Sequence, residues 1–246
     1  MESLNPRTCK FCDKSFKRER TLASHACEPK RRHADSVERY WQLAFRAYQK
    51  FYRYNYPTRK DDRTKEQFIK SQYYTGFIKF GRFLHTGLVL GHEKYVEYVI
   101  RNAIKLERWS SDAIYDEYLK EHLFKETIDR AAERMMLYIM NWASDNEQLA
   151  DNFFNELTPA KALVLIRNGT ISPWIIYGTQ QGEKIIDSMS DEQLDIAVNF
   201  INPKKWRPKV RMKQDEVKWL KNIFSNLIIQ DELKEELNRK FDESHG

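Results

Sequence analysis

The first thirty residues place two thiols and an imidazole at the spacing of a small zinc finger. Cys9 and Cys12 are separated by two residues, so one tight turn can direct both sulfur atoms at a single ion. His25 follows on a predicted helix, and Phe16 and Leu22 occupy the two positions where such a module needs apolar side chains. Five matches within one run favour a zinc-binding ββα finger over a metal-free loop.

The fourth ligand departs from the usual pattern. A second His is expected after three to five intervening residues, but those positions, 29–31, hold Pro, Lys and Arg. We prefer Cys27, since a third thiolate suits zinc, although the helix must then end or tighten close to His25. His33 is the alternative, and it would need an irregular turn near Pro29. With three Cys in the chain, a disulfide framework explains the pattern less well than a reducing intracellular setting.

The rest of the chain predicts an all-α fold. Its 246 residues include only 8 Gly and 7 Pro, and no strand-length alternation stands out. We expect a zinc finger with a basic tail over residues 1–33 and an all-helical body over 34–246, folded as an irregular helical bundle. The longest aliphatic runs are too short to cross a bilayer, so no membrane contact is predicted.

Several helix boundaries can be predicted. One amphipathic helix is expected over residues 34–56, with Val37 on its apolar stripe. One or two helices should follow over 64–90, interrupted near Gly76, Gly81 or Gly87. Further along, residues 158–159, 172–173 and 190 are start signals, and residues 168–169 are a stop signal. The last helices are expected at about 213–228 and 230–241, the latter with Ile229, Leu233, Leu237 and Phe241 in one stripe.

Positive charge is concentrated at the front of the chain. Residues 1–82 carry 20 Lys and Arg against 9 Asp and Glu, whereas residues 83–246 carry 22 against 27. A basic patch beside a zinc finger favours nucleic acid, DNA more than RNA, although acidic proteins also bind such surfaces. In a finger docked on DNA, three positions fixed by Leu22 and His25 face the bases, and cations beside them and in the basic tail meet phosphates. The predicted contacts are Arg18, Arg20, Thr21, Ser24, Lys30, Arg31 and Arg32.

Two other charged clusters allow more than one interpretation. The segment 202–214 contains six cations and no acid, which fits an exposed phosphate-binding loop and equally a solvated connector. Glu126, Asp129 and Glu133 are spaced to share a helical face among cations, which predicts a solvated surface. The sequence has no phosphate-binding glycine loop, nucleophile elbow or HExxH motif, so it leans against an enzyme. A metal-dependent nuclease stays an alternative, because carboxylates can converge from distant helices.

Ten stretches of the chain carry a resemblance to one family. They include the CKFC run at 9–12 and residues 16–22, 25–28, 30–32, 47–48, 51–52, 77–82, 99–102, 105–106 and 171–174. Together they resemble zinc-finger proteins of large contractile-tailed bacteriophages, which carry an N-terminal finger of C2HC or C2H2 type. The resemblance implies the ligand set Cys9, Cys12, His25 and Cys27, and a phage protein acting in the cytoplasm of an infected bacterium. It implies no activity.

The sequence therefore predicts a zinc-binding, non-enzymatic protein that contacts nucleic acid and acts in phage transcription or genome handling. Its main alternative is an adaptor whose finger and body bind a host or phage protein of the transcription or replication machinery. The nuclease is the second alternative.

Overall fold

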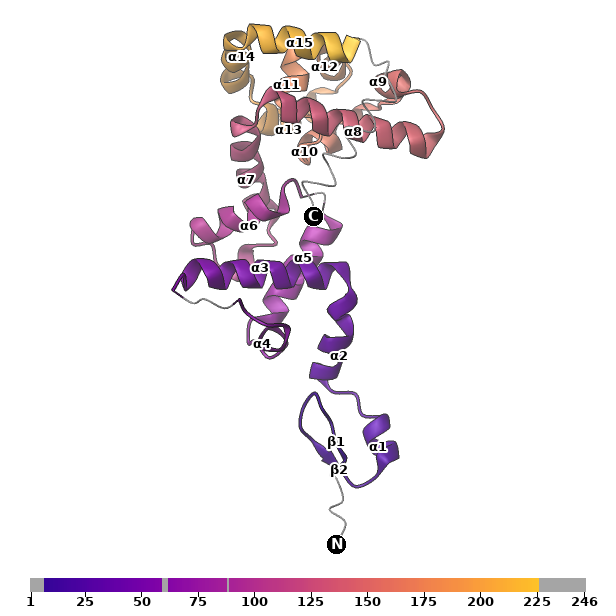
Figure 1. Ribbon diagram of the computed structural model, residues 1–246. Coiled ribbons are helices and arrows are strands. Elements are labelled where there is room, and N and C mark those ends of the chain that lie inside the picture. The colour runs from indigo at the N-terminus through magenta and orange to yellow at the C-terminus, as the bar shows by residue number, and fades with distance from the viewer. Residues whose placement is uncertain (1–6, 59–61, 88, 226–246) are drawn as a thin grey trace. The chain divides into compact units, whose positions relative to one another are not determined.

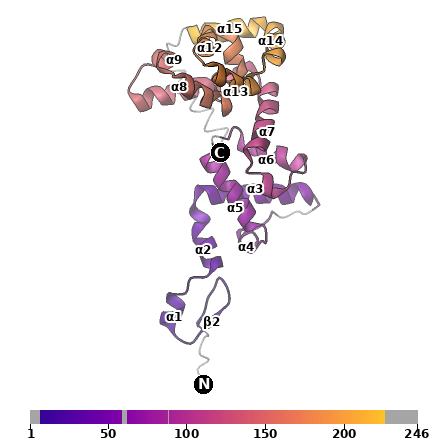
Figure 2. The same ribbon diagram turned by 180° about the vertical axis from the view of Figure 1, so that it is seen from behind.

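The computed structural model describes residues 7–58, 62–87 and 89–225. The chain divides into two compact units, Met1–Tyr115 and Asp116–Gly246, here called the first and second units. Within the described residues almost all regular structure is helical, and the strands are confined to one short pair near the N-terminus (Figures 1 and 2). The predicted all-α fold with a small ββα finger is confirmed. The boundary at residues 33 and 34 stays a prediction.

The first unit begins with the finger and continues into a helical part. Strands β1 and β2 pair antiparallel, with Arg7 opposite Phe16, and α1 packs on both. The elements of this unit are β1 (Arg7–Thr8), β2 (Ser15–Phe16), α1 (Glu19–Ala23), α2 (Glu28–Ala34), η1 (Asp35–Val37), α3 (Arg39–Asn55), α4 (Lys65–Ile69), α5 (Tyr74–Thr86), α6 (His92–Arg101) and η2 (Leu106–Arg108); α7 (Asp112–Lys125) starts in this unit and ends in the second.

The helix predicted over 34–56 is shorter than expected. The chain before it forms α2 and the 3₁₀ turn η1, and α3 begins only at Arg39. Val37 therefore lies outside the apolar stripe and is 81% exposed. The predicted stripe is confirmed in the middle of the helix, where Trp41, Phe45 and Tyr48 are buried. These aromatic rings form part of the core of the first unit.

Of the three glycines suggested as interruptions over residues 64–90, Gly87 is the one at which a helix ends. The break falls between α4 and α5, and α5 then runs through Gly76 and Gly81 before it ends at Thr86 with Gly87 as its cap. At Gly81 an added Cβ would lie 2.2 Å from the carbonyl oxygen of Tyr40 and 2.7 Å from Cβ of Ala44. Gly81 is therefore a point of close backbone approach between α3 and α5, which pack against each other in the first unit.

The second unit follows its start and stop signals closely. Thr158, Ser172 and Ser190 each accept a hydrogen bond from a backbone N–H of the following helix, as N-caps should. Gly169 ends α10 with φ of 82°, the predicted left-handed cap. The helices of this unit, besides the end of α7, are α8 (Ile128–Asn146), α9 (Phe153–Glu156), α10 (Pro159–Arg167), α11 (Pro173–Gly178), α12 (Gln180–Asp187), α13 (Asp191–Ile201), α14 (Pro203–Met212) and α15 (Gln214–Ser225), with the 3₁₀ turn η3 (Ala150–Asn152).

Two expectations for this unit need correction or fall outside the described residues. The basic segment 202–214 is not a loop, because residues 203–212 form helix α14 despite Pro208 within it. Helix α15 is described as far as Ser225, so the predicted helix at 230–241 and its apolar stripe lie outside the described residues. No helix in the described ranges combines the length and apolar character that a bilayer span requires.

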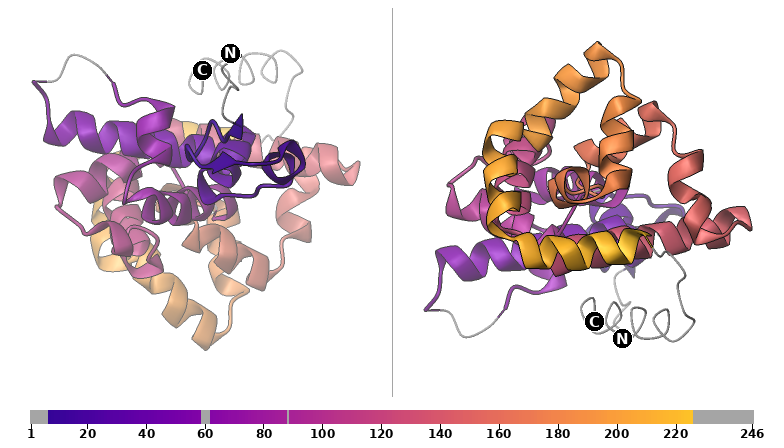
Figure 3. Two further views of the ribbon diagram at one scale, coloured as in Figure 1. Left: turned by 90° about the horizontal axis from the view of Figure 1, so that it is seen from below. Right: turned by 90° about the horizontal axis from the view of Figure 1, so that it is seen from above.

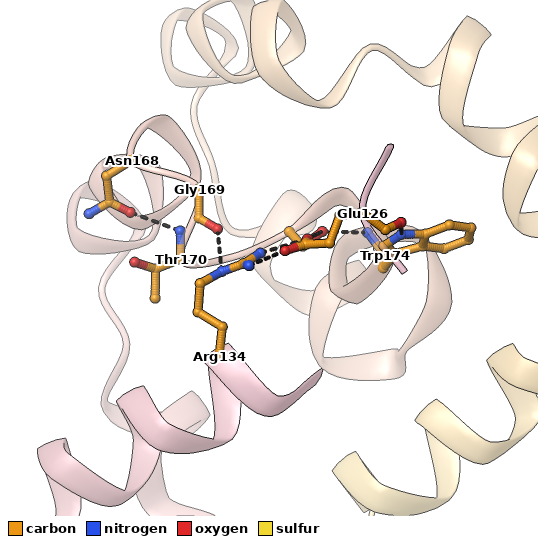
Figure 4. Close-up of polar contacts among 7 residues, drawn as sticks. Glu126, Arg134, Asn168, Gly169, Thr170 and Trp174 are labelled. Carbon is orange, nitrogen blue, oxygen red and sulfur yellow. Dashed lines mark hydrogen bonds and ion pairs between the residues drawn. The ribbon is translucent and has the colours of Figure 1, made fainter. Parts of the chain in front are cut away.

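Glu126 is buried, and the prediction of a solvated face was wrong for it. It lies between α7 and α8 and is 8% exposed. Its carboxylate accepts hydrogen bonds from both terminal nitrogens of Arg134, and Nη2 lies 2.8 Å from Oε2. Nε of Arg134 donates a third hydrogen bond, to the carbonyl of Gly169 at 2.9 Å (Figure 4). Trp174 also donates its indole N–H to the backbone carbonyl of Glu126 at 3.1 Å. One ion pair thus connects the starts of α8 and α11 and the end of α10.

Replacing Glu126 with Ala should lower the free energy of unfolding by about 3–5 kcal/mol, because Arg134 would stay largely buried without its counter-charge. Glu117, an exposed carboxylate on α7, provides the matched control, and Glu117→Ala should change stability by no more than about 0.5 kcal/mol. Denaturant unfolding of the full chain, followed by circular dichroism, measures both. Equal losses in the two variants would contradict a structural role for this ion pair.

Candidate metal centre

A tight turn after β1 brings the first two thiols together. The backbone N–H of Cys9 donates to the carbonyl of Lys14 at 2.9 Å, and the N–H of Asp13 donates back to the carbonyl of Cys9 at 2.8 Å. Asp13 has φ of 59°, a left-handed conformation that Asp adopts more readily than most residues. These bonds close the chain around Cys12, so that its thiol faces that of Cys9.

The other two ligand side chains follow the end of α1. This helix has only five residues and ends at Ala23, where Ser24 caps it and donates its hydroxyl to the carbonyl of Arg20 at 3.0 Å. His25 therefore lies just beyond the helix and not on it, which corrects the sequence-based expectation. The early end confirms the condition for using Cys27, because the extended backbone at that residue turns its thiol back toward the hairpin.

Four side chains converge on one point. The ligand atoms of Cys9, Cys12, His25 and Cys27 all lie within 4.8 Å of one another. Sγ of Cys9 is 3.9 Å from Sγ of Cys27, and Sγ of Cys12 is 3.3 Å from Nε2 of His25. Tetrahedral zinc with ordinary bond lengths separates two sulfurs by about 3.8 Å and a sulfur from a nitrogen by about 3.5 Å. The spacing and the donor set therefore both fit a tetrahedral metal ion.

His33 does not belong to this group. It lies on α2, which begins after Cys27 with Pro29 in its first turn, so Pro29 starts a helix where the alternative needed an irregular turn. The ring of His33 packs instead against Phe11, with 5.0 Å between ring centroids. The structure thus brings Cys27 to the other ligands and leaves His33 in an aromatic contact.

The local environment affects the two knuckle thiols differently. A hydrogen bond from the backbone N–H of Phe11 is the main cause that lowers the pKa of Cys9. The pKa of Cys12 is raised: the backbone N–H of Lys14 lowers it, but burial and the neighbouring thiols of Cys27 and Cys9 outweigh that effect. All three cysteines are free. When two or more of these neighbouring thiols are ionised, their negative charges repel one another. A bound cation would offset that repulsion, because metal ligation favours the thiolate form.

The predicted nucleic-acid contacts occupy different environments. Arg18, Arg20, Thr21 and Ser24 are exposed on or beside α1, and Arg31 is exposed on α2. Lys30 is half-buried and donates Nζ to the carbonyl of His25 at 3.3 Å, so it braces the chain beside a ligand.

Arg32 is committed to contacts within the first unit. It pairs with Glu28, donates Nη1 to the carbonyl of Ile69 at 2.7 Å, and lies with its guanidinium 4.3 Å from the centroid of the Tyr74 ring. These contacts attach α2 to α4 and α5. Sequence reasoning missed this role, although the four-residue spacing of Glu28 and Arg32 is the signal of a helical ion pair.

The Cys3His group is the single convergent set of three or more metal-ligand side chains in the described part of the chain. Compared with known family models, curated proteins and solved structures, the chain matches none of them. The ligand geometry therefore stands on its own, and the resemblance to phage zinc-finger proteins stays a prediction.

Zinc content should distinguish the two candidate fourth ligands. We expect the purified full chain to bind one zinc ion, and Cys27→Ala to weaken zinc binding by more than about 100-fold, since even residues behind the ligands contribute 10–100-fold. His33→Ala, the matched control, should keep full zinc content. Elemental analysis and competition with a chromophoric chelator measure both. Loss of zinc in His33→Ala with retention in Cys27→Ala would contradict this ligand set.

Proposed function

We propose that the N-terminal finger binds a structural zinc ion and that, through it, the protein contacts nucleic acid without catalysing a reaction. The convergence of three thiols and one imidazole is the observation that carries the zinc assignment. Four protein ligands fill a tetrahedral shell and leave no position for water or substrate, which is the arrangement of structural sites. Soft sulfur donors also favour zinc over hard cations such as magnesium.

The finger surface supports nucleic acid as the ligand. Arg18, Arg20 and Arg31 are exposed, and no ion pair involves them within residues 7–58, 62–87 and 89–225. Three further cations, Lys10, Lys14 and Lys17, are exposed on the hairpin side of the finger. Unpaired cations around a small folded module form the electrostatic surface that phosphate backbones bind. Arg32 is left out of this surface, because its guanidinium already has partners.

Duplex DNA fits this surface better than RNA, since finger helices usually enter the major groove of DNA. A single finger reads only about three base pairs, so the affinity must come mainly from phosphate contacts. The cellular role that we propose is regulation of phage transcription or genome handling inside an infected bacterium. The free cysteines support an intracellular site, because thiols that bind zinc must stay reduced.

Salt-dependent DNA binding tests this proposal. The zinc-loaded full chain should bind a labelled duplex of unrelated sequence, with an affinity that falls steeply as salt rises. The triple variant R18Q/R20Q/R31Q should weaken binding and reduce the slope of log affinity against log salt by about 0.9 for each phosphate that the protein no longer neutralises. Fluorescence anisotropy at four or more salt concentrations gives both quantities.

The control variant K79Q/K94Q/K105Q removes the same charge from exposed positions of the first unit away from the finger. It should keep both the affinity and the slope. If the two triple variants behave alike, the finger is not the DNA-binding surface. If the wild-type chain binds DNA at no salt concentration, the proposal fails, and the adaptor role becomes the better explanation.

A further inference from the structure

We propose that helix α14 of the second unit is a separate phosphate-binding surface, which uses Lys204, Arg207 and Arg211 to contact the backbone of a nucleic acid. The inference rests on nucleic acid being the ligand of this protein, as proposed above. It adds a surface in a different unit and does not depend on zinc.

The first observation is where the positive charge lies. Residues 116–246 carry 18 Lys and Arg against 23 Asp and Glu, so this part of the chain is acidic as a whole. Within it, residues 202–214 contain six cations and no acid. The structure places most of them on one helix of ten residues, α14. Positive charge is therefore gathered on one element of an otherwise acidic unit.

The second observation is that the cations of α14 divide into two faces. Trp206 is buried on the inner face, and the ammonium of Lys209 lies 4.8 Å from the ring centroid of Trp174 and 4.9 Å from that of Trp206. Lys204, Arg207 and Arg211 are exposed. At 100° per residue these three lie within about 60° of one another, opposite the inner face. They form a stripe, which we call the α14 stripe.

The stripe is long enough to contact several successive phosphates of one strand. Lys204 and Arg211 are seven residues apart, so the stripe is about 10 Å long. Successive phosphates of one strand of a duplex are separated by about 3.4 Å along the helix axis, so the stripe spans about three of them. Its position is fixed, because Trp206 packs against Trp174 with 5.3 Å between ring centroids and Lys209 donates Nζ to the carbonyl of Phe124.

The third observation is that the stripe has no counter-charge in the chain as described. Neighbouring cations do have one: Lys213 pairs with Glu216 at 2.5 Å and Lys218 with Asp215 at 3.4 Å. No ion pair within residues 7–58, 62–87 and 89–225 involves any member of the stripe. Lys204 also lies in the first turn of α14, where the backbone N–H groups already carry partial positive charge. An anionic ligand would relieve this unfavourable arrangement.

Nucleic acid fits these observations better than an acidic protein. Every member of the stripe is a cation, and the half-buried ring of Tyr177 lies 5.9 Å from the guanidinium of Arg207. Specific protein interfaces depend instead on apolar or aromatic anchors at their centre. Phosphate contacts need no such anchor, since release of counterions supplies most of the binding energy. Arg207 and Arg211 are also suited to two-point contacts with phosphate oxygens.

The triple variant K204Q/R207Q/R211Q of the full chain tests the α14 stripe. Binding to the same labelled duplex should weaken, and the slope of log affinity against log salt should fall by about 0.9 for each phosphate left without its cation, hence by about two to three in total. The matched control K161Q/R167Q/K184Q removes three exposed cations from α10 and α12 of the same unit and should leave both quantities unchanged. Thermal unfolding checks that both variants are folded.

A second variant tests whether charge is the cause. The exchange K204R/R207K/R211K keeps every charge and should retain most of the salt dependence that the neutral variant loses. If K204Q/R207Q/R211Q is folded and binds DNA like its control, the inference is overturned while the function of the finger stands. If the stripe variant loses binding but R18Q/R20Q/R31Q does not, the inference holds and the proposed role of the finger fails. Equal salt-dependent binding of the wild type to polyglutamate would also overturn it, since the stripe would then select no phosphate.

Discussion

Three sulfur atoms and one ring nitrogen converge at one point in the N-terminal segment. Among described residues before α2, Cys9 is the one whose side chain is fully buried, and Phe16 and Leu22 are only half-buried. So little apolar burial cannot offset the entropy of ordering some twenty residues. Under the proposal that Cys9, Cys12, His25 and Cys27 hold zinc, metal ligation supplies the stabilisation that residues 7–27 lack, and the surface of the finger depends on it.

Helix α2 attaches the finger to the rest of the first unit. It begins directly after Cys27, and Arg32 fixes its far end through the carbonyl of Ile69 and the ring of Tyr74. The finger is thus continuous with a large aromatic core built on α3 and α5, where Gly81 allows the two backbones to meet. A cation that the sequence suggests for DNA is used instead for internal attachment.

In the second unit a large apolar core, and not a cluster of metal ligands, determines where polar groups lie. There the apolar core is large, and Glu126 and Arg134 are drawn into it as a pair because either charge alone would be costly to bury. Trp174 connects this pair to α14, because its indole bonds to the backbone of Glu126 and its ring packs against Trp206. The right-hand view in Figure 3 shows α14 meeting α15 at a corner. The exposed face of α14 is consequently held in a fixed orientation toward solvent.

The sequence by itself determined the elements that local chemistry controls. Cys and His spacing predicted the ligand cluster, helical periodicity predicted the all-α body, and caps such as Ser190 predicted where helices begin. Only the tertiary structure decided the features that depend on distant partners. It removed His33 from the ligand group, buried Glu126 against Arg134, and kept α5 helical through Gly81. The physical reason is that capping and ligand spacing act within a few residues, whereas the burial of a charge or a glycine depends on what packs against it from elsewhere in the chain.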